Sequence, residues 1–165
     1  MLAFICIEYE LYSWIQLPKT NLGLAKTRIS ELPEEVGKLQ FLQVLDLSRN
    51  DDMELPSTII KLRRLMCLLI DSDHKRLPGG LGNLISMEVL HDIIGDSISV
   101  VKELGSMERL RELLIVLDNL SLELELAFVQ SLGKMSNIQD LVVGCTGYEV
   151  WGKGGWPLEV SENLP

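Results

Sequence analysis

The stretch from Leu39 to Asn50 reads LQFLQVLDLSRN, and its apolar spacing decides the fold. Its second half, Leu45-x-Leu47, alternates with a period of two, which predicts a short strand with one buried face. The preceding residues Val36, Leu39 and Leu42 are spaced by three, which suits a short turn of α- or 3₁₀-helix. The stretch therefore predicts a helical turn on one side of the chain and a strand on the other.

The same pattern recurs along the chain, with copies that begin at Leu39, Leu62, Leu84, Met107 and Met135. Leu-Pro pairs precede the first three copies, at Leu32-Pro33, Leu55-Pro56 and Leu77-Pro78. Proline fixes its own backbone and favours extended geometry in the residue before it, so each pair turns the chain onto the other side. The copies begin 23, 22, 23 and 28 residues apart, which is the period of leucine-rich repeats. We predict an α/β solenoid of about five and a half coils, with a curved parallel sheet on the concave side and short helices or 3₁₀ turns on the convex side.

Two departures from the repeat are informative. In the third copy Asp92 stands where a strand leucine is expected, which predicts either a bulge or a one-residue shift of the strand. The fourth unit is longer, and its residues 123–134 are predicted to form a true helix. A polar residue that can bond free backbone groups follows each strand, except in the third copy, where Gly95 takes its place. These polar residues are Thr27, Asn50, Asp73, Asp118 and Thr146.

Composition excludes several classes of function. The 165 residues include 15 Lys and Arg against 24 Asp and Glu, a net charge of −9 that disfavours nucleic-acid binding. Leucine occurs 32 times while aromatic residues make up only 5% of the chain, which favours a repetitive core. The three cysteines are far apart and form no CxxC pair, so a reduced, cytoplasmic setting fits best. Apolar runs are too short to span a membrane.

The sequence predicts no catalytic, metal or cofactor site, and we expect no enzymatic activity. His74 and His91 are the only histidines, and Cys67 has no histidine close in sequence. The basic residues Lys61, Arg63, Arg64, Lys75 and Arg76 form either a solvated flank or a dock for an acidic partner. We divide the chain into a non-repeat segment (1–20), a repeat domain (21–147) and a non-repeat tail (148–165).

The outward side of the strands is the candidate binding surface, because solenoids bind partners on the concave sheet face. Exposed apolar side chains gather there toward the C-terminal half, and such clusters mark contact surfaces. An equally good interpretation is that further sequence covers this face. The candidate residues are Val44, Asp46, Cys67, Leu69, Asp71, Val89, His91, Glu112, Leu114, Val116, Asp140 and Val142.

Residues 22–147 resemble a known family. Stretches that carry the likeness include LAKTRISELPEEVGKLQFLQVLDLSRN (24–50), RLPGGLGNLISMEVL (76–90) and VVKELGSMERLRELLIV (100–116). They are similar to the leucine-rich-repeat region of plant intracellular disease-resistance proteins. These are nucleotide-binding leucine-rich-repeat immune receptors, and the likeness is strongest to the coiled-coil type of grasses. The Leu-Pro repeat is also similar to that of Ras-group intracellular leucine-rich-repeat proteins.

The resemblance implies a protein-binding module in plant defense, acting by recognition or by holding a receptor inactive. The implied partners are a pathogen effector, a guarded host protein or the receptor's own nucleotide-binding domain. The chain has no GxxxxGK[ST] loop, so we expect it to bind neither ATP nor ADP. That departure favours a fragment or truncated product of such a receptor. The alternatives are a free-standing Ras-group scaffold and a remnant without function.

Overall fold

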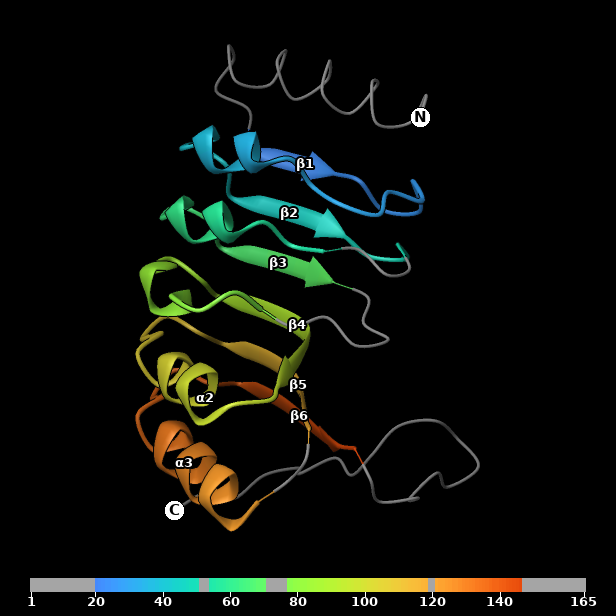
Figure 1. Ribbon diagram of the computed structural model, residues 1–165. Coiled ribbons are helices and arrows are strands. Elements are labelled where there is room, and N and C mark those ends of the chain that lie inside the picture. Colours follow the sequence, from blue (N-terminus) through green and yellow to red (C-terminus); the bar gives the residue numbers. More distant parts are fainter. Residues whose placement is uncertain (1–19, 51–53, 71–76, 119–120, 147–165) are drawn as a thin grey trace.

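The computed structural model describes residues 20–50, 54–70, 77–118 and 121–146. One parallel sheet contains six strands stacked in sequence order, and helical turns lie on its other side (Figure 1). The strands are β1 (Asn21–Gly23), β2 (Val44–Leu47), β3 (Cys67–Ile70), β4 (Val89–Gly95), β5 (Glu112–Leu117) and β6 (Asp140–Cys145). The predicted leucine-rich-repeat solenoid is confirmed.

The two-residue period of the strands separates core from surface. In β2 and β3 buried and half-buried residues alternate, and Leu45, Leu47, Leu68 and Ile70 are the buried ones. Parallel pairing aligns Leu45 with Leu68, so that equivalent leucines of successive coils stack in the core. Apolar area removed from water in this way contributes about 25 cal/mol per Å² to stability. The predicted inward and outward strand positions are therefore confirmed.

The opposite side of the solenoid changes character along the chain. Three 3₁₀ turns come first: η1 (Glu34–Lys38), η2 (Ser57–Lys61) and η3 (Leu81–Asn83). Pro33 and Pro56 precede η1 and η2 in extended geometry, as the Leu-Pro pattern predicts. Two α-helices follow: α2 (Ile98–Leu104) and α3 (Leu122–Leu132). The helix predicted over residues 123–134 is thus confirmed as α3, whereas α2 was not predicted.

Serine caps each of the two α-helices in the described part of the chain. The Ser97 hydroxyl accepts a hydrogen bond from the Val100 N–H at 3.3 Å, and the Ser121 hydroxyl accepts one from the Leu124 N–H at 3.1 Å. A serine at this position satisfies a backbone donor that the helix itself leaves free. These two units lack the Leu-Pro pair and begin their return with a serine cap, and both return through α-helix rather than through a 3₁₀ turn.

Asn50 joins the first coils by hydrogen bonds. Its amide donates to the Leu24 carbonyl at 2.7 Å and to the Leu47 carbonyl at 2.9 Å, and its oxygen accepts from the Thr27 N–H at 3.0 Å. The side chain is only 1% exposed, so these bonds offset the cost of burying a polar group. Near the other end, the Thr146 hydroxyl donates to Asp118. The predicted bonding of free backbone groups is confirmed at Asn50, whereas Thr146 bonds the Asp118 side chain and Asp73 lies outside the described residues.

The irregularity at Asp92 is a bulge. Strand β4 pairs with β5 through Leu90 and Leu113, and pairing resumes only at Ile93 with Ile115. Asp92 has a φ of +58°, in the left-handed region, which accommodates the extra residue. Gly95 then comes so close to β5 that a Cβ there would lie 2.8 Å from the Leu117 side chain. A side chain at this position would therefore have to displace the end of the Leu117 side chain.

Candidate protein-binding face

The outward strand residues form columns that run across the sheet. One column is continuous through Asn21, Val44, Cys67, Val89, Glu112 and Asp140, which pair in that order from β1 to β6. A second joins Asp46, Leu69 and His91, and beyond the bulge Leu114 pairs with Val142. The sequence-predicted residues on these strands are thus brought onto one face, which we call the concave face.

The middle of the concave face carries charge. His91 Nε2 lies 3.4 Å from a carboxylate oxygen of Glu112. This contact joins residues 21 positions apart in the chain, so spacing within one repeat could not reveal it. The two residues come from adjacent strands, β4 and β5, and the pair lies next to the bulge. Half-exposed polar contacts of this kind contribute little to stability but are available to orient a partner.

Cys67 lies beside this charged region and is held as a neutral thiol. Burial raises the pKa of the Cys67 thiol, and the negative charges of Asp46 and Glu112 raise it further. A thiolate is the nucleophilic form of cysteine, so a raised pKa makes Cys67 less reactive than an ordinary cysteine. Its role on the concave face is that of a small, weakly polar contact residue.

The C-terminal part of the concave face is apolar. Leu114, Val116 and Val142 are half-buried there and belong to the paired strands β5 and β6. The bulge puts Ile94 in register with Val116 on the same side of the sheet, where Ile94 is buried, at 6% exposure. Sequence reasoning missed Ile94 as a face residue, although the Asp92 insertion was the signal that could have found it. Asp71, the remaining predicted face residue, lies outside the described residues.

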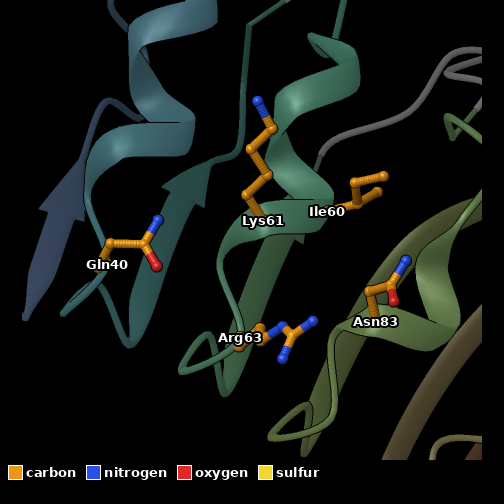
Figure 2. Close-up of a pocket in the computed structure, with 5 residues that line it drawn as sticks. All are labelled: Gln40, Ile60, Lys61, Arg63 and Asn83. Atoms are coloured by element: carbon orange, nitrogen blue, oxygen red, sulfur yellow. The ribbon is translucent and has the colours of Figure 1, made fainter.

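A shallow cleft occurs on the helical side of the first coils. Its volume is about 400 Å³, and its lining residues are Gln40, Ile60, Lys61, Arg63 and Asn83. Figure 2 shows the cationic groups of Lys61 and Arg63 pointing in different directions, so they do not converge on one anion. Arg64 instead lies over the Phe41 ring, 5.0 Å from its centre. Lys75 and Arg76, the rest of the predicted basic cluster, lie outside the described residues.

The part of the chain that the structure describes contains neither a metal-binding cluster nor a membrane-spanning helix. Within it, no group of three His, Cys, Asp or Glu side chains is arranged to hold a metal ion. No helix there has the length and apolar character needed to cross a membrane. The segments 1–19 and 147–165, which contain most of the two predicted non-repeat regions, lie outside the described residues.

Comparison with known proteins supports the repeat architecture described above. The model of a family described as a leucine-rich repeat region matches residues 16–164. The chain belongs to this leucine-rich repeat family. Its curated relatives include a probable disease resistance protein of Arabidopsis thaliana, 34% identical over 104 residues, 59% of this chain and 14% of that protein. The TMV resistance protein N of Nicotiana glutinosa is 32% identical over 93 residues, 53% of this chain and 8% of that protein.

A third relative, the disease resistance protein Pik-2 of Oryza sativa, is 33% identical over 48 residues, 29% of this chain and 5% of that protein. The predicted resemblance to the repeat region of plant disease-resistance proteins is confirmed. The chain spans at most about a seventh of the length of these three relatives. Their names therefore describe proteins that are much longer than the repeat region shared with this chain.

Solved structures support the fold. A leucine-rich-repeat protein of Leptospira interrogans matches with a TM-score of 0.54 and 22% identity, covering 80% of this chain and 39% of that one. The leucine-rich-repeat ectodomain of the receptor kinase SOBIR1 from Arabidopsis thaliana matches with a TM-score of 0.51 and 16% identity, covering 75% of this chain and 68% of that one. At these identities the likeness shows the fold alone.

Proposed function

We propose that the chain is a protein-binding module of plant defense and that its partner docks on the concave face. The observation that carries the proposal is the register of β1 to β6, which gathers a charged centre and an apolar C-terminal part on one side of the sheet. Solenoids of this type bind proteins on that side. A leucine-rich repeat is typically a scaffold for interactions rather than an enzyme, and the neutral Cys67 thiol fits that role.

The chemistry of the concave face suggests how a partner is held. Leu114, Val116 and Val142 offer apolar contact, and the His91 ring and the Glu112 carboxylate offer polar contact at the border of these residues. Interfaces with an apolar centre and a polar rim are typical of specific protein binding. The resemblance to disease-resistance proteins makes the partner a pathogen effector, a guarded host protein or a nucleotide-binding domain. We place the interaction in the cytoplasm for the same reason.

Retention of proteins from plant leaf extract tests the proposal. The immobilised 165-residue chain is compared with the double variant Leu69→Asp/Leu114→Asp and with a matched control, Ile85→Asp, which is exposed on the helical side. Quantitative mass spectrometry is expected to find proteins that the wild type and the control retain and the folded double variant loses. If the double variant retains the same proteins as the wild type, the concave face is not the binding surface. If no protein is retained specifically, a remnant without function becomes the better interpretation.

A further inference from the structure

The second repeat copy carries a cluster of positive charge on a chain whose net charge is −9. Lys61, Arg63 and Arg64 are all exposed there, at the edge of the solenoid where the strands begin. Arg63 and Arg64 stand four and three residues before Cys67, the first residue of β3. We call Lys61, Arg63 and Arg64 the basic patch.

The basic patch is not neutralised by the described part of the chain. Lys61 has an equivalent in the preceding coil, Lys38, whose ammonium lies 3.6 Å from the Glu35 carboxylate. Thr58 occupies the position of Glu35 in η2, so Lys61 has no such partner on its own turn. No carboxylate of the described residues lies within ion-pair distance of the three cations. The charge of the patch is therefore available to a ligand.

The fold does not require cations at these positions. Other copies carry neutral or acidic side chains in place of Arg63, among them Gln40, Glu108 and Ser136. The patch lies in the interior of the stack, with described coils on both sides, so it does not arise at an end of the solenoid. Complementary charge steers and orients partner proteins. The basic patch is therefore a second candidate contact surface, separate from the concave face.

The shallow cleft on the helical side adjoins the basic patch. Lys61 and Arg63 line it together with the half-buried Ile60 (Figure 2). Gln40 and Asn83 line it from the preceding and following coils, and each amide donates to a carbonyl of its own turn, at 2.8 and 2.9 Å. Their side-chain oxygens remain to accept N–H groups of a ligand. The cleft thus offers cations, hydrogen-bond acceptors and apolar contact across three coils.

An aromatic ring borders the patch on the side of the preceding coil. Phe41 is 51% exposed, and Arg64 lies over its ring, 5.0 Å from the centre. The two residues hold equivalent positions of neighbouring coils, because Val44 and Cys67 pair in register three residues further on. Stacking orients the guanidinium and leaves its N–H groups at the edge for a carboxylate. Aromatic side chains and arginine are enriched in surfaces that bind proteins.

The arrangement of the charges specifies the kind of ligand. Lys61 and Arg63 point in different directions (Figure 2), and Arg64 lies over a ring of the preceding coil, so one compact anion cannot meet all three. Carboxylates spaced along an extended chain can. We propose that the basic patch and the cleft bind an extended acidic segment of another protein, with its carboxylates on the three cations and an apolar side chain against Ile60 or Phe41. A long nucleic acid or an anionic membrane would also meet the acidic remainder of the chain, which repels it.

Titration with designed peptides tests the proposal. The full 165-residue chain is mixed with a fluorescent peptide of about ten residues, in which Glu alternates with Leu and Phe and a proline keeps the chain extended. We expect saturable binding that weakens as salt is added. It should be at least about tenfold tighter than binding of the same peptide with Gln in place of Glu. Equal binding of the two peptides would overturn the proposal. No saturable binding up to about 1 mM peptide would leave the basic patch a solvated flank and also overturn it.

Variants locate the site. Arg63→Glu/Arg64→Glu is expected to weaken binding of the Glu peptide about tenfold or more. The matched control Lys102→Glu/Lys134→Glu makes the same change in net charge at exposed positions of later coils, and it should bind within about twofold of the wild type. Equal weakening in the control would mean attraction to charge anywhere on the chain and contradict the proposal.

A milder variant keeps the test decisive if charge reversal unfolds the chain. Arg63→Gln introduces the side chain that Gln40 provides at the equivalent position of the first copy, so the chain is expected to melt like the wild type. We expect it to weaken binding of the Glu peptide about threefold or more. A folded Arg63→Gln chain that binds like the wild type would contradict the role of the patch.

Further measurements distinguish other occupants. Oligothymidine and vesicles of phosphatidylserine and phosphatidylcholine are expected not to bind, and sedimentation is expected to show no dimer that Arg63→Glu/Arg64→Glu abolishes. Patch-dependent binding of either probe, or a patch-dependent dimer, would make the occupant a nucleic acid, a membrane or a second copy and overturn the proposal. Leu69→Asp/Leu114→Asp should leave binding of the Glu peptide unchanged, because the concave face is a separate surface. A loss of binding in that variant would place the peptide on the concave face instead.

Discussion

The two ends of the solenoid build the same strand and return by different routes. In the N-terminal half, Leu-Pro leads into the 3₁₀ turns η1 and η2, and the buried Asn50 amide links adjacent coils. In the C-terminal half, Ser97 and Ser121 cap the α-helices α2 and α3. A 3₁₀ turn offers few outward positions, whereas the eleven residues of α3 present a complete second face. The serine caps thus begin longer helical returns in the C-terminal half.

The largest expected effects compare inward and outward leucines in each half. Leu68→Asp and Leu113→Asp bury an unpaired carboxylate and remove core packing, so each is expected to lower the free energy of unfolding by several kcal/mol. Leu69→Asp and Leu114→Asp change half-buried face residues and should cost within about 1 kcal/mol. Denaturant melts of all four variants measure this. If Leu69→Asp lowers the free energy of unfolding as much as Leu68→Asp does, the assignment of Leu69 to the outward face is wrong.

The hydrogen-bonded polar position should matter more in the N-terminal half. Asn50→Ala removes the hydrogen bonds to the Leu24 and Leu47 carbonyls and the acceptor of the Thr27 N–H, which is expected to cost about 1–3 kcal/mol of stability. Thr146→Val removes one hydroxyl that donates to Asp118 at a half-buried site, and we expect less than about 1 kcal/mol. Chemical denaturation of both variants compares the two. If Asn50→Ala and Thr146→Val lower the stability equally, Asn50 contributes no more to stability than Thr146 does.

Helix caps should matter only in the C-terminal half. Ser97→Ala and Ser121→Ala each remove a capping hydrogen bond and are expected to cost about 1 kcal/mol. Ser57→Ala is the control in the N-terminal half, because η2 follows Pro56 and has no side-chain cap. We expect it to change stability by a few tenths of a kcal/mol. A large loss for Ser57→Ala would mean that proline alone does not set the turn.

The smallest expected effect is the reactivity of the thiol at Cys67. Its raised pKa leaves less thiolate at pH 8 than an ordinary cysteine has, so alkylation by iodoacetamide should be slower than at the exposed Cys145. Asp46→Asn and Glu112→Gln each remove a negative charge that raises this pKa. The pKa should fall and alkylation should become faster in both variants, as followed by peptide mass spectrometry. Unchanged rates would show that burial alone controls the thiol.

The raised pKa also links stability to pH. The folded chain holds the Cys67 proton to higher pH than the unfolded chain does, so this contribution to stability is fully present below the unfolded pKa. It is lost as pH rises toward the folded pKa. Alkaline melts of the wild type and Cys67→Ala should therefore converge as the pH increases, and parallel curves would contradict the assignment.

The sequence by itself determined the repeat, the parallel sheet and the inward leucines, because these depend on local periodicity that each coil repeats. It also determined the helix α3 and the bonding role of Asn50. Tertiary structure decided the rest, since it depends on which residues meet across coils. The irregularity at Asp92 is a bulge, because β4 resumes its pairing with β5 at Ile93. The bulge aligns Ile94 with Val116 on the outward side of the sheet. It also lies beside the His91–Glu112 pair. On α3 the apolar residues divide between two faces, and only packing against the core shows which of them remain in solvent.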